Sequence, residues 1–120
     1  MNNKNYFLSG VTELLILAIL KDKDSYVYEI VKTINTMSNN VFSISQNTIY
    51  ASTYKLENEG KISEYSKLVG KKRTRIYYHI EESGLKYFEE ILSSYRSTTE
   101  SVNSILDSLA CNPNIKDELS

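Results

Sequence analysis

Apolar positions recur along the chain with different spacings, and each spacing predicts an element. Residues 11–20 are apolar on nearly every side of a helix, which predicts a core helix buried between other elements. The next segment places Tyr26, Ile30 and Ile34 at four-residue intervals, as in a helix with one buried face. The polar residues 35–40 are expected to end this second helix.

The following segment, up to Ile80, predicts a third, short helix and then a two-stranded hairpin. The side-chain oxygen of Ser45 can cap a helix, and Gly60 can adopt the left-handed conformation that ends one. Two runs of strand-like composition come next, separated by a loop rich in Lys and Arg. The expected boundaries are residues 45–59 for the helix, 62–68 and 74–80 for the strands, and 69–73 for the loop.

Alternation along the second strand predicts which side chains face the core. Ile76, Tyr78 and Ile80 are expected to point inward, and the residues between them toward solvent or a ligand. His79 belongs to the outer set, and no Cys, Asp or His at ligand spacing accompanies it. We therefore expect a solvated histidine and no metal site.

The last part of the chain has the clearest periodicity, with apolar residues at alternating spacings of three and four over more than three heptads. Such a stripe can pack back on its own domain or pair with a second copy. A helix of about 25 residues spans roughly 37 Å and would outreach so small a core, so we favour dimerisation. The predicted dimerisation residues are Leu85, Phe88, Leu92, Tyr95, Val102, Leu106 and Leu109.

These elements, in this order, predict a mainly α-helical fold with a small β-hairpin: a winged helix-turn-helix plus a long C-terminal helix. We expect a DNA-binding domain over residues 1–80, a dimerisation helix over 81–110 and a frayed tail over 111–120. A chain of 120 residues has no room for a second, catalytic domain.

The charge distribution strengthens the DNA-binding interpretation. The net charge is only -1, but residues 1–80 hold 11 Lys and Arg against 7 Asp and Glu, whereas residues 81–120 hold 3 against 8. Phosphate attraction is local, because salt screens charges over about 8 to 10 Å. A basic patch can therefore bind DNA on a protein with no overall positive charge, and the acidic part is expected to face away from the DNA.

Two groups of residues are the predicted DNA contacts. In the third helix, Gln46 and Asn47 can each present a donor and an acceptor to adenine in the major groove, although Asn47 and Ser45 could instead only satisfy helix amides. In the loop, four cations within five positions are expected to contact phosphates or the minor groove. The full predicted set is Ser45, Gln46, Asn47, Thr48, Tyr50, Lys55, Lys71, Lys72, Arg73 and Arg75.

Other function classes find less support. No nucleophile with its base, carboxylate pair in a cleft, metal cluster or phosphate-binding glycine loop is visible, so we expect no enzyme and no cofactor. The longest apolar run, residues 14–20, is short of the roughly 20 residues that cross a bilayer, and the start lacks a signal-peptide pattern, so a cytoplasmic protein is expected. The alternative is a winged-helix adaptor that binds another protein and no DNA.

Four segments together resemble the PadR-type transcriptional regulators. They are Gly10-Val-Thr-Glu-Leu-Leu-Ile-Leu-Ala-Ile-Leu20, Ser25-Tyr-Val-Tyr-Glu-Ile30, Ser45-Gln-Asn-Thr-Ile-Tyr50 with Lys55-Leu-Glu-Asn-Glu-Gly60, and Gly70-Lys-Lys-Arg-Thr-Arg-Ile-Tyr-Tyr78. The chain departs from the family pattern with Val27 for Gly, Ala51 for Pro and Glu81 for Thr. The resemblance implies a homodimeric repressor that occupies double-stranded DNA at an inverted-repeat operator and leaves it when a small-molecule effector or another signal arrives.

Overall fold

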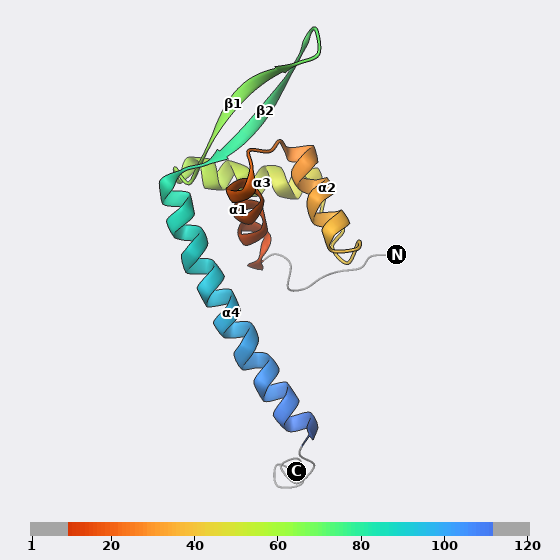
Figure 1. Cartoon of the computed structure of the whole chain (residues 1–120), viewed down its shortest axis with the longest axis vertical. Coiled ribbons are helices and arrows are strands. Elements are labelled where there is room, and N and C mark those ends of the chain that lie inside the picture. The colour runs from red at the N-terminus through yellow and green to blue at the C-terminus, as the bar shows by residue number, and fades with distance from the viewer. Residues whose placement is uncertain (1–9, 112–120) are drawn as a thin grey trace. The chain divides into compact units, whose positions relative to one another are not determined.

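The computed structural model describes residues 10–111 and contains four helices and one antiparallel hairpin (Figure 1). This confirms the predicted mainly helical fold with a small hairpin and a long last helix. The chain divides into two compact units, Met1–Phe88 and Glu89–Ser120, and nearly all of the expected tail falls on residues outside the described part. The elements are α1 (Thr12–Asp22), α2 (Val27–Met37), α3 (Gln46–Asn58), β1 (Ile62–Val69), β2 (Arg73–Ile80) and α4 (Glu82–Cys111).

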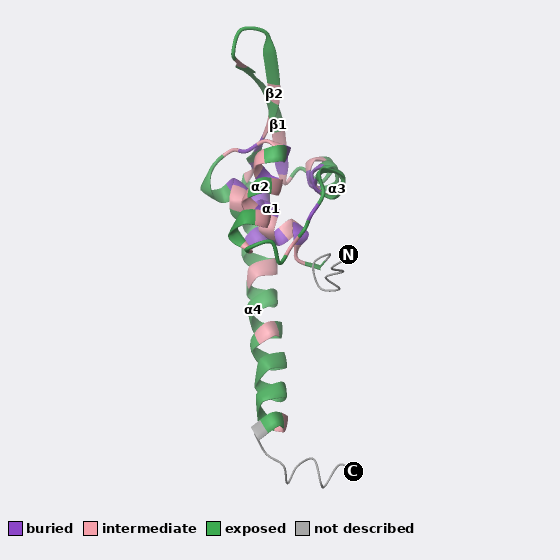
Figure 2. Ribbon diagram, turned by 90° about the vertical axis from the view of Figure 1, so that its right-hand side faces the viewer, coloured by how far each residue is buried: buried purple, intermediate pink, exposed green. Residues whose placement is uncertain are grey.

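The core of the first unit lies where α1, α2, α3 and the base of the hairpin meet (Figure 2). Ile16, Ile30, Ile49 and Leu56 are completely buried there. Burying an aliphatic side chain of this size contributes about 1.5 to 3 kcal/mol relative to leaving it exposed. These few residues therefore fix how the three helices pack, and with them the direction of α3.

α1 is only partly the all-round buried helix that its composition predicts. Leu14, Ile16, Leu17 and Leu20 are buried, but Ala18 is exposed, and Leu15 and Ile19 are half-buried. The exposed side of α1 borders an apolar groove of about 650 Å³, whose lining also includes Met37 and Phe42. The prediction is wrong for this side, because no other described element of this unit covers it.

The loop between α1 and α2 is tied to the hairpin. Ser25, which is fully buried, forms an isolated antiparallel bridge with Tyr78, donating its N–H at 3.3 Å and accepting one at 2.9 Å. This bridge pairs the backbone of Tyr78 on the edge of β2 that faces away from β1. An unpaired strand edge would leave such backbone groups exposed. The base of the hairpin is therefore held on both sides.

Each strand of the hairpin extends one residue further toward the tip than predicted, with Val69 paired to Arg73 and Gly70 at a φ of +69° in the turn. Tyr78 and Ile80 face the core as expected, but Ile76 is 43% exposed. The prediction for Ile76 fails because the outer half of the hairpin extends past the helices, so neither of its faces meets a core there (Figure 2).

The start of α4 is fitted closely to the turn between α3 and β1. Gly60 has the predicted left-handed conformation, with a φ of +74°, and its carbonyl accepts a hydrogen bond from Ser83 at 2.8 Å. The Lys61 carbonyl accepts the N–H of Glu81 at 2.9 Å and lies against Gly84, where any Cβ would collide with it. A side chain at position 84 would push the first turn of α4 away from this carbonyl.

The apolar stripe of α4 has two parts with different surroundings. Phe88 is 7% exposed and its ring lies under the Lys21 ammonium, so this residue, predicted to serve in dimerisation, is already buried in its own chain. In the second unit, residues 89–110 include no buried side chain. Its exposed apolar residues include Tyr95, Val102, Ile105 and Leu106, at 45%, 48%, 59% and 58%.

Candidate nucleic-acid interface

The amino end of α3 has the cap that its sequence predicts. Ser45 accepts the backbone N–H of Thr48 at 3.2 Å, and the hydroxyls of these two residues lie 3.0 Å apart. Gln46 and Asn47, in the turn so capped, are exposed and make no side-chain hydrogen bond within the described residues. The cap occupies Ser45 and Thr48 and leaves the two amides available to a ligand.

The position of this turn is set by a residue that the sequence did not indicate. The half-buried side chain of Asn35, in α2, accepts the N–H of Ile44 at 3.1 Å and donates to the carbonyl of Ile44 at 3.4 Å. Asn39 and Asn40 take up the left-handed conformation, with φ of 53° and 63°, as asparagine does more readily than most residues. Asn35 thus connects α2 to the residue that precedes the α3 cap.

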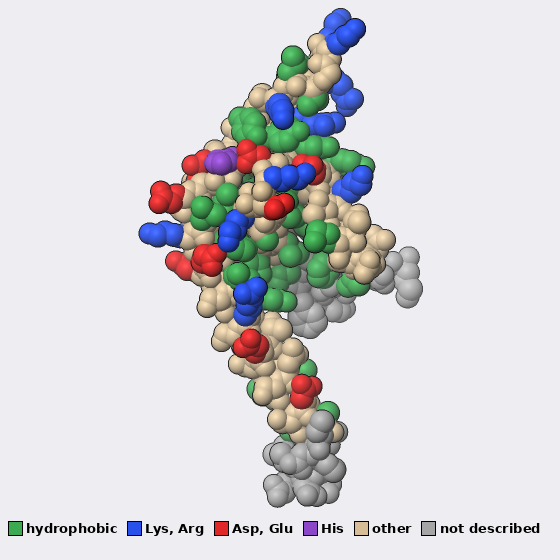
Figure 3. All heavy atoms as spheres, viewed as in Figure 1, with side chains coloured by type: hydrophobic (Ala, Val, Ile, Leu, Met, Phe, Trp, Pro, Cys, Tyr) green, Lys and Arg blue, Asp and Glu red, His purple; other side chains and the backbone are tan. Residues whose placement is uncertain are grey.

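The tip of the hairpin carries the strongest local charge. Lys71, Lys72 and Arg73 are exposed, and Figure 3 shows Lys and Arg side chains at the end of the hairpin. Within the described residues none of the three forms an ion pair. Unpaired cations at the end of a projecting hairpin can bind a polyanion without first breaking an ion pair.

Aromatic rings hold the next cations along the hairpin. The Arg75 guanidinium lies over the Tyr26 ring, 4.3 Å from its centroid, and the Lys67 ammonium lies 5.2 Å from the centroid of Tyr77. Tyr77 in turn meets Tyr26 edge-on at 5.4 Å and stacks on Tyr65 at 5.8 Å. The loop before α2 and both strands are therefore joined by one aromatic cluster, which orients Arg75.

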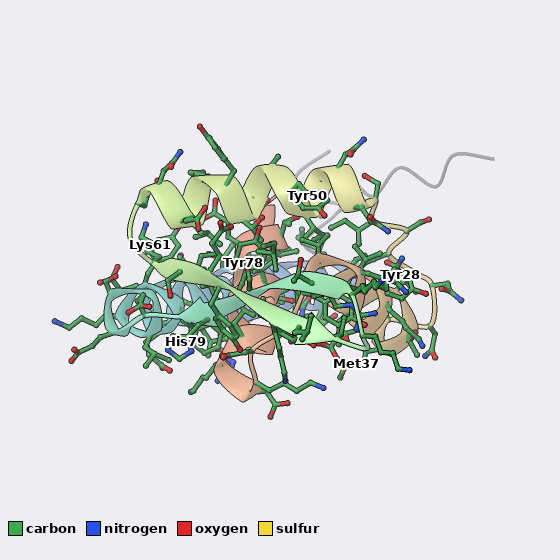
Figure 4. All side chains as sticks on the ribbon, turned by 90° about the horizontal axis from the view of Figure 1, so that it is seen from above. Tyr28, Met37, Tyr50, Lys61, Tyr78 and His79 are labelled. Atoms are coloured by element: carbon green, nitrogen blue, oxygen red, sulfur yellow. The ribbon has the colours of Figure 1, made fainter. Side chains whose placement is uncertain are left out.

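A cleft of about 710 Å³ separates α3 from β2 and from the start of α2. In Figure 4 Tyr50 extends from α3, Tyr28 lies on α2, and Tyr78 occupies the space between α3 and the strands. The lining residues are Tyr26, Val27, Tyr28, Gln46, Tyr50, Glu64, Arg73, Thr74, Arg75, Ile76 and Tyr78. The structure thus brings together residues from the predicted helix and the predicted loop, and adds Tyr28.

Tyr28 was missed by the sequence analysis although a signal was present. It falls outside the stripe formed by Tyr26, Ile30 and Ile34, and its side chain is 56% exposed. An aromatic ring on the outer face of a helix that has its apolar stripe elsewhere is not required by folding. Tyr54, on the exposed side of α3 at 68%, is a second aromatic residue of this kind.

Lys55, one of the predicted DNA contacts, is bound to a carboxylate of its own chain. Its ammonium donates to Glu13 of α1 at 2.8 Å, and this hydrogen bond and the charge of Glu13 raise the pKa of Lys55. The other oxygen of Glu13 accepts the hydroxyl of Tyr87 at 3.1 Å. Lys55 and Tyr87 therefore meet on one carboxylate of α1, an arrangement that depends on residues far from Lys55 in the sequence.

His79 is bonded to a carboxylate, where the sequence analysis expected only solvation. Its Nδ1 lies 2.8 Å from one oxygen of Asp24, and Tyr65 donates to the other oxygen at 2.7 Å. Burial by itself would raise the pKa of Asp24, but the hydrogen bonds from Tyr65 and His79 outweigh it and hold this pKa below its ordinary value. The three side chains fasten the hairpin to the loop before α2.

Two other features are absent from residues 10–111. No group of three His, Cys, Asp or Glu side chains there could hold a metal ion. Nor is any helix in this range long and apolar enough to cross a membrane.

Comparison with known proteins connects this geometry to a family. The model of the PadR-like family of transcriptional regulators matches residues 16–90. An uncharacterised protein of Lysinibacillus sphaericus is 30% identical over 102 residues, which cover 85% of this chain and 94% of that protein.

Solved structures agree with the family match. A transcriptional regulator from Clostridium thermocellum gives a TM-score of 0.76 at 29% identity over 83% of this chain and 97% of its own. A PadR-like transcriptional regulator from Bacillus cereus gives 0.75 at 29% identity over 85% and 97%. Bacillus subtilis PadR, solved in complex with operator DNA, gives 0.63 at 24% identity over 68% of this chain and 47% of its own, a likeness of fold alone.

The family match also bears on the enzyme class considered above. Members of this family are transcriptional regulators and not enzymes, as the absence of a catalytic motif in the sequence predicted. The match covers α2, α3, the whole hairpin and the start of α4, which include the elements that form the candidate interface. The protein therefore belongs to the PadR-like family of transcriptional regulators.

Proposed function

We propose that this protein regulates transcription as a homodimer that binds double-stranded DNA through α3 and the wing, by which we mean β1, β2 and their turn. The observation that carries the proposal is the exposure of Gln46 and Asn47 beside a hairpin whose tip holds three cations without an ion pair among the described residues. An adaptor that bound only proteins would have no need of that arrangement. The solved operator complex of Bacillus subtilis PadR, which shares this fold, supports the same conclusion.

The two elements have different tasks in this proposal. Gln46 and Asn47 read bases in the major groove, since an amide can pair with both the donor and the acceptor of adenine. Lys71, Lys72 and Arg73 bind phosphates, or the minor groove beside them, and so supply affinity with little sequence preference. Lys55 is left out, because its ammonium already binds Glu13.

Dimerisation rests on apolar surfaces that a single chain leaves uncovered. The second unit exposes Tyr95, Val102, Ile105 and Leu106 on one helix, and α1 exposes one side along the apolar groove. Exposed apolar stripes of this regularity are typical of helices that pair. We place the dimer contacts along residues 92–109 and omit Phe88, because this ring is buried in its own chain.

The direction of regulation follows from the family resemblance. In this proposal the dimer represses by occupying an inverted repeat and is released by a small-molecule effector or another signal. Release requires only that the signal favours a dimer geometry in which the two α3 helices no longer fit successive major grooves, since a ligand shifts an equilibrium by its differential affinity for the two states.

The test compares variants of the two elements on the DNA upstream of the protein's own gene. Lys72→Ala should weaken binding to all duplexes and lower the salt slope by about 0.9 for each phosphate that the side chain no longer neutralises. Gln46→Ala should instead narrow the margin between this DNA and random DNA by roughly 1 to 3 kcal/mol. Lys86→Ala, which removes an exposed cation from α4, is the matched control and should change neither quantity.

Two outcomes would contradict the proposal in different ways. An unchanged salt slope for Lys72→Ala would show that the wing cations do not bind phosphate. If the wild type bound no duplex at low salt, the protein would instead be a winged-helix adaptor that binds another protein.

A further inference from the structure

We propose that the cleft between α2, α3 and β2 is a phosphate subsite, in which the Tyr28 hydroxyl and the Arg75 guanidinium hold the same phosphodiester of the bound DNA strand. The inference rests on the proposed function, because it assumes that DNA is the ligand. It adds a third element, α2, to the interface and assigns a binding role to a tyrosine outside the helix and the loop that the sequence singled out.

Charge is distributed unevenly along the cleft. Arg73 and Arg75 lie toward the tip of β2, whereas Glu64 is paired across the strands with Tyr78, nearer the base. Burial and the neighbouring charge of Glu64 raise the pKa of Glu57, which is not part of the cleft lining, so a second carboxyl group lies near Glu64. An anion is therefore favoured at the tip end and disfavoured at the base, which restricts the phosphate to the part of the cleft beside Arg75.

Arg75 is suited to this task by its geometry. The Tyr26 ring lies 4.3 Å from the guanidinium and orients it, so part of the entropy of ordering a long side chain is lost before DNA binds. A guanidinium has several N–H donors in a fixed plane and can bind two oxygens of one phosphate at once. Arg75 is half-buried and forms no ion pair within the described residues, so its charge is not neutralised in the free protein.

Tyr28 supplies a donor without a charge. Its side chain is 56% exposed, and its hydroxyl has no hydrogen-bond partner in the part of the chain that the structure describes. The ring stacks on Tyr26 at 6.5 Å between centroids, which joins Tyr28 to the same aromatic cluster that orients Arg75. An unpaired hydroxyl on the wall of a cleft with a cationic end is a fitting donor to a phosphate oxygen.

The experiment uses full-length protein and a 30-base-pair duplex selected from random sequence by the wild type. Tyr28→Phe removes one oxygen and keeps the ring, and it should weaken binding by about 12- to 160-fold for each protomer's contact, the range expected for a hydrogen bond to a charged group. Because this variant loses no charge, its salt slope should equal that of the wild type. Arg75→Gln should weaken binding and also lower the slope by about 0.9 for each protomer, because each loses one phosphate contact.

Methylphosphonate substitution then locates the subsite on the DNA. Replacing phosphates in symmetry-related pairs, one in each half-site, by the uncharged methylphosphonate should reveal one pair of positions at which wild-type affinity falls and at which the two variants differ little from the wild type. On that duplex Tyr28→Phe and Arg75→Gln should lose little further affinity, because their partner is already gone. Ser104→Ala, which removes an exposed hydroxyl from α4 outside the apolar stripe, is the matched control and should bind every duplex like the wild type.

Three results separate the possible failures. Equal affinity of Tyr28→Phe and wild type for the unmodified duplex would overturn the subsite while leaving DNA binding through α3 and the wing intact. If the two variants became insensitive at different phosphates, the claim of one shared phosphodiester would be wrong. If the selection yielded no bound duplex at low salt, the proposed function itself would fail.

Discussion

The hydrogen bonds of Asn35 provide the most direct test of how the fold positions the interface. Asn35→Ala removes both bonds to the backbone of Ile44, a residue that is only 6% exposed. The bond to the Ile44 N–H has ordinary length at 3.1 Å, whereas the bond to its carbonyl, at 3.4 Å, is long and should contribute less.

The expected magnitude follows from leaving one buried backbone donor unpaired. Such a group costs about 1 to 3 kcal/mol, so Asn35→Ala should lower the free energy of unfolding by roughly that amount. Asn35→Asp is the matched variant, because it keeps an acceptor for the Ile44 N–H; it loses the donor to the long bond and places a carboxylate oxygen near the Ile44 carbonyl. It should therefore retain part of the stability that Asn35→Ala loses.

The assay is urea unfolding followed by circular dichroism at one fixed protein concentration, since dimerisation would couple stability to concentration. DNA affinity should fall in the same order, because Ile44 precedes the cap of α3. A loss below about 0.5 kcal/mol for Asn35→Ala, which is the range of a neutral surface substitution, would refute the claim that this side chain holds the α2–α3 connection.

Three other perturbations test separate features. Gly84→Ala should destabilise the protein in urea unfolding, because its Cβ would collide with the Lys61 carbonyl; unchanged stability would mean that the first turn of α4 moves freely. Asp24→Asn should lower the free energy of unfolding above pH 3.8, the ordinary pKa of an aspartate, because the lowered pKa of Asp24 in the folded state favours folding there. As the pH falls through the lowered pKa, the difference in stability from wild type should vanish. A difference that stayed constant with pH would contradict the role of the charge. Leu106→Glu should turn dimers into monomers in sedimentation, because an unpaired carboxylate in an apolar contact costs several kcal/mol. Ser104→Glu, off the stripe, should leave the protein dimeric. Equal behaviour of the two variants would exclude the apolar stripe of α4 as the dimer contact.

Local signals in the sequence predicted most of the fold. Ser45 caps α3 and Gly60 ends the same segment with a positive φ, because each effect depends on a residue and its immediate neighbours. The spacing of apolar residues predicted the long last helix for the same reason. The order of elements then predicted the fold, since few arrangements bury three short helices and a hairpin in one small core.

The sequence is least informative where a residue depends on a partner far away along the chain. Lys55 binds Glu13, 42 positions earlier, and His79 binds Asp24, 55 positions earlier. Phe88 fits the heptad pattern, yet it is buried against its own domain. No periodicity distinguishes an apolar residue that contacts its own chain from one that contacts a partner.

The residues of the candidate site likewise differ in whether the sequence alone reveals them. Basic residues at the tip of a hairpin can be recognised from composition, because the tip has no tertiary surroundings to change their state. Tyr28 could not be assigned in this way, since its position on the wall of the cleft depends on how α2 packs against β2. The cap bonds of Ser45 and Thr48, in contrast, join residues three positions apart, and the part of Ser45 in them was predicted from the sequence.

The central claim, a dimer that places two α3 helices in successive major grooves, is tested most directly by selecting bound sequences from random 40-base-pair duplexes. Such a dimer should select an inverted repeat whose half-site centres lie about ten base pairs, or a multiple of that, apart. Insertion of five base pairs between the half-sites should abolish tight binding, because it turns one of them to the opposite side of the helix. Enrichment of no sequence at low salt, or unchanged affinity after the insertion, would contradict it.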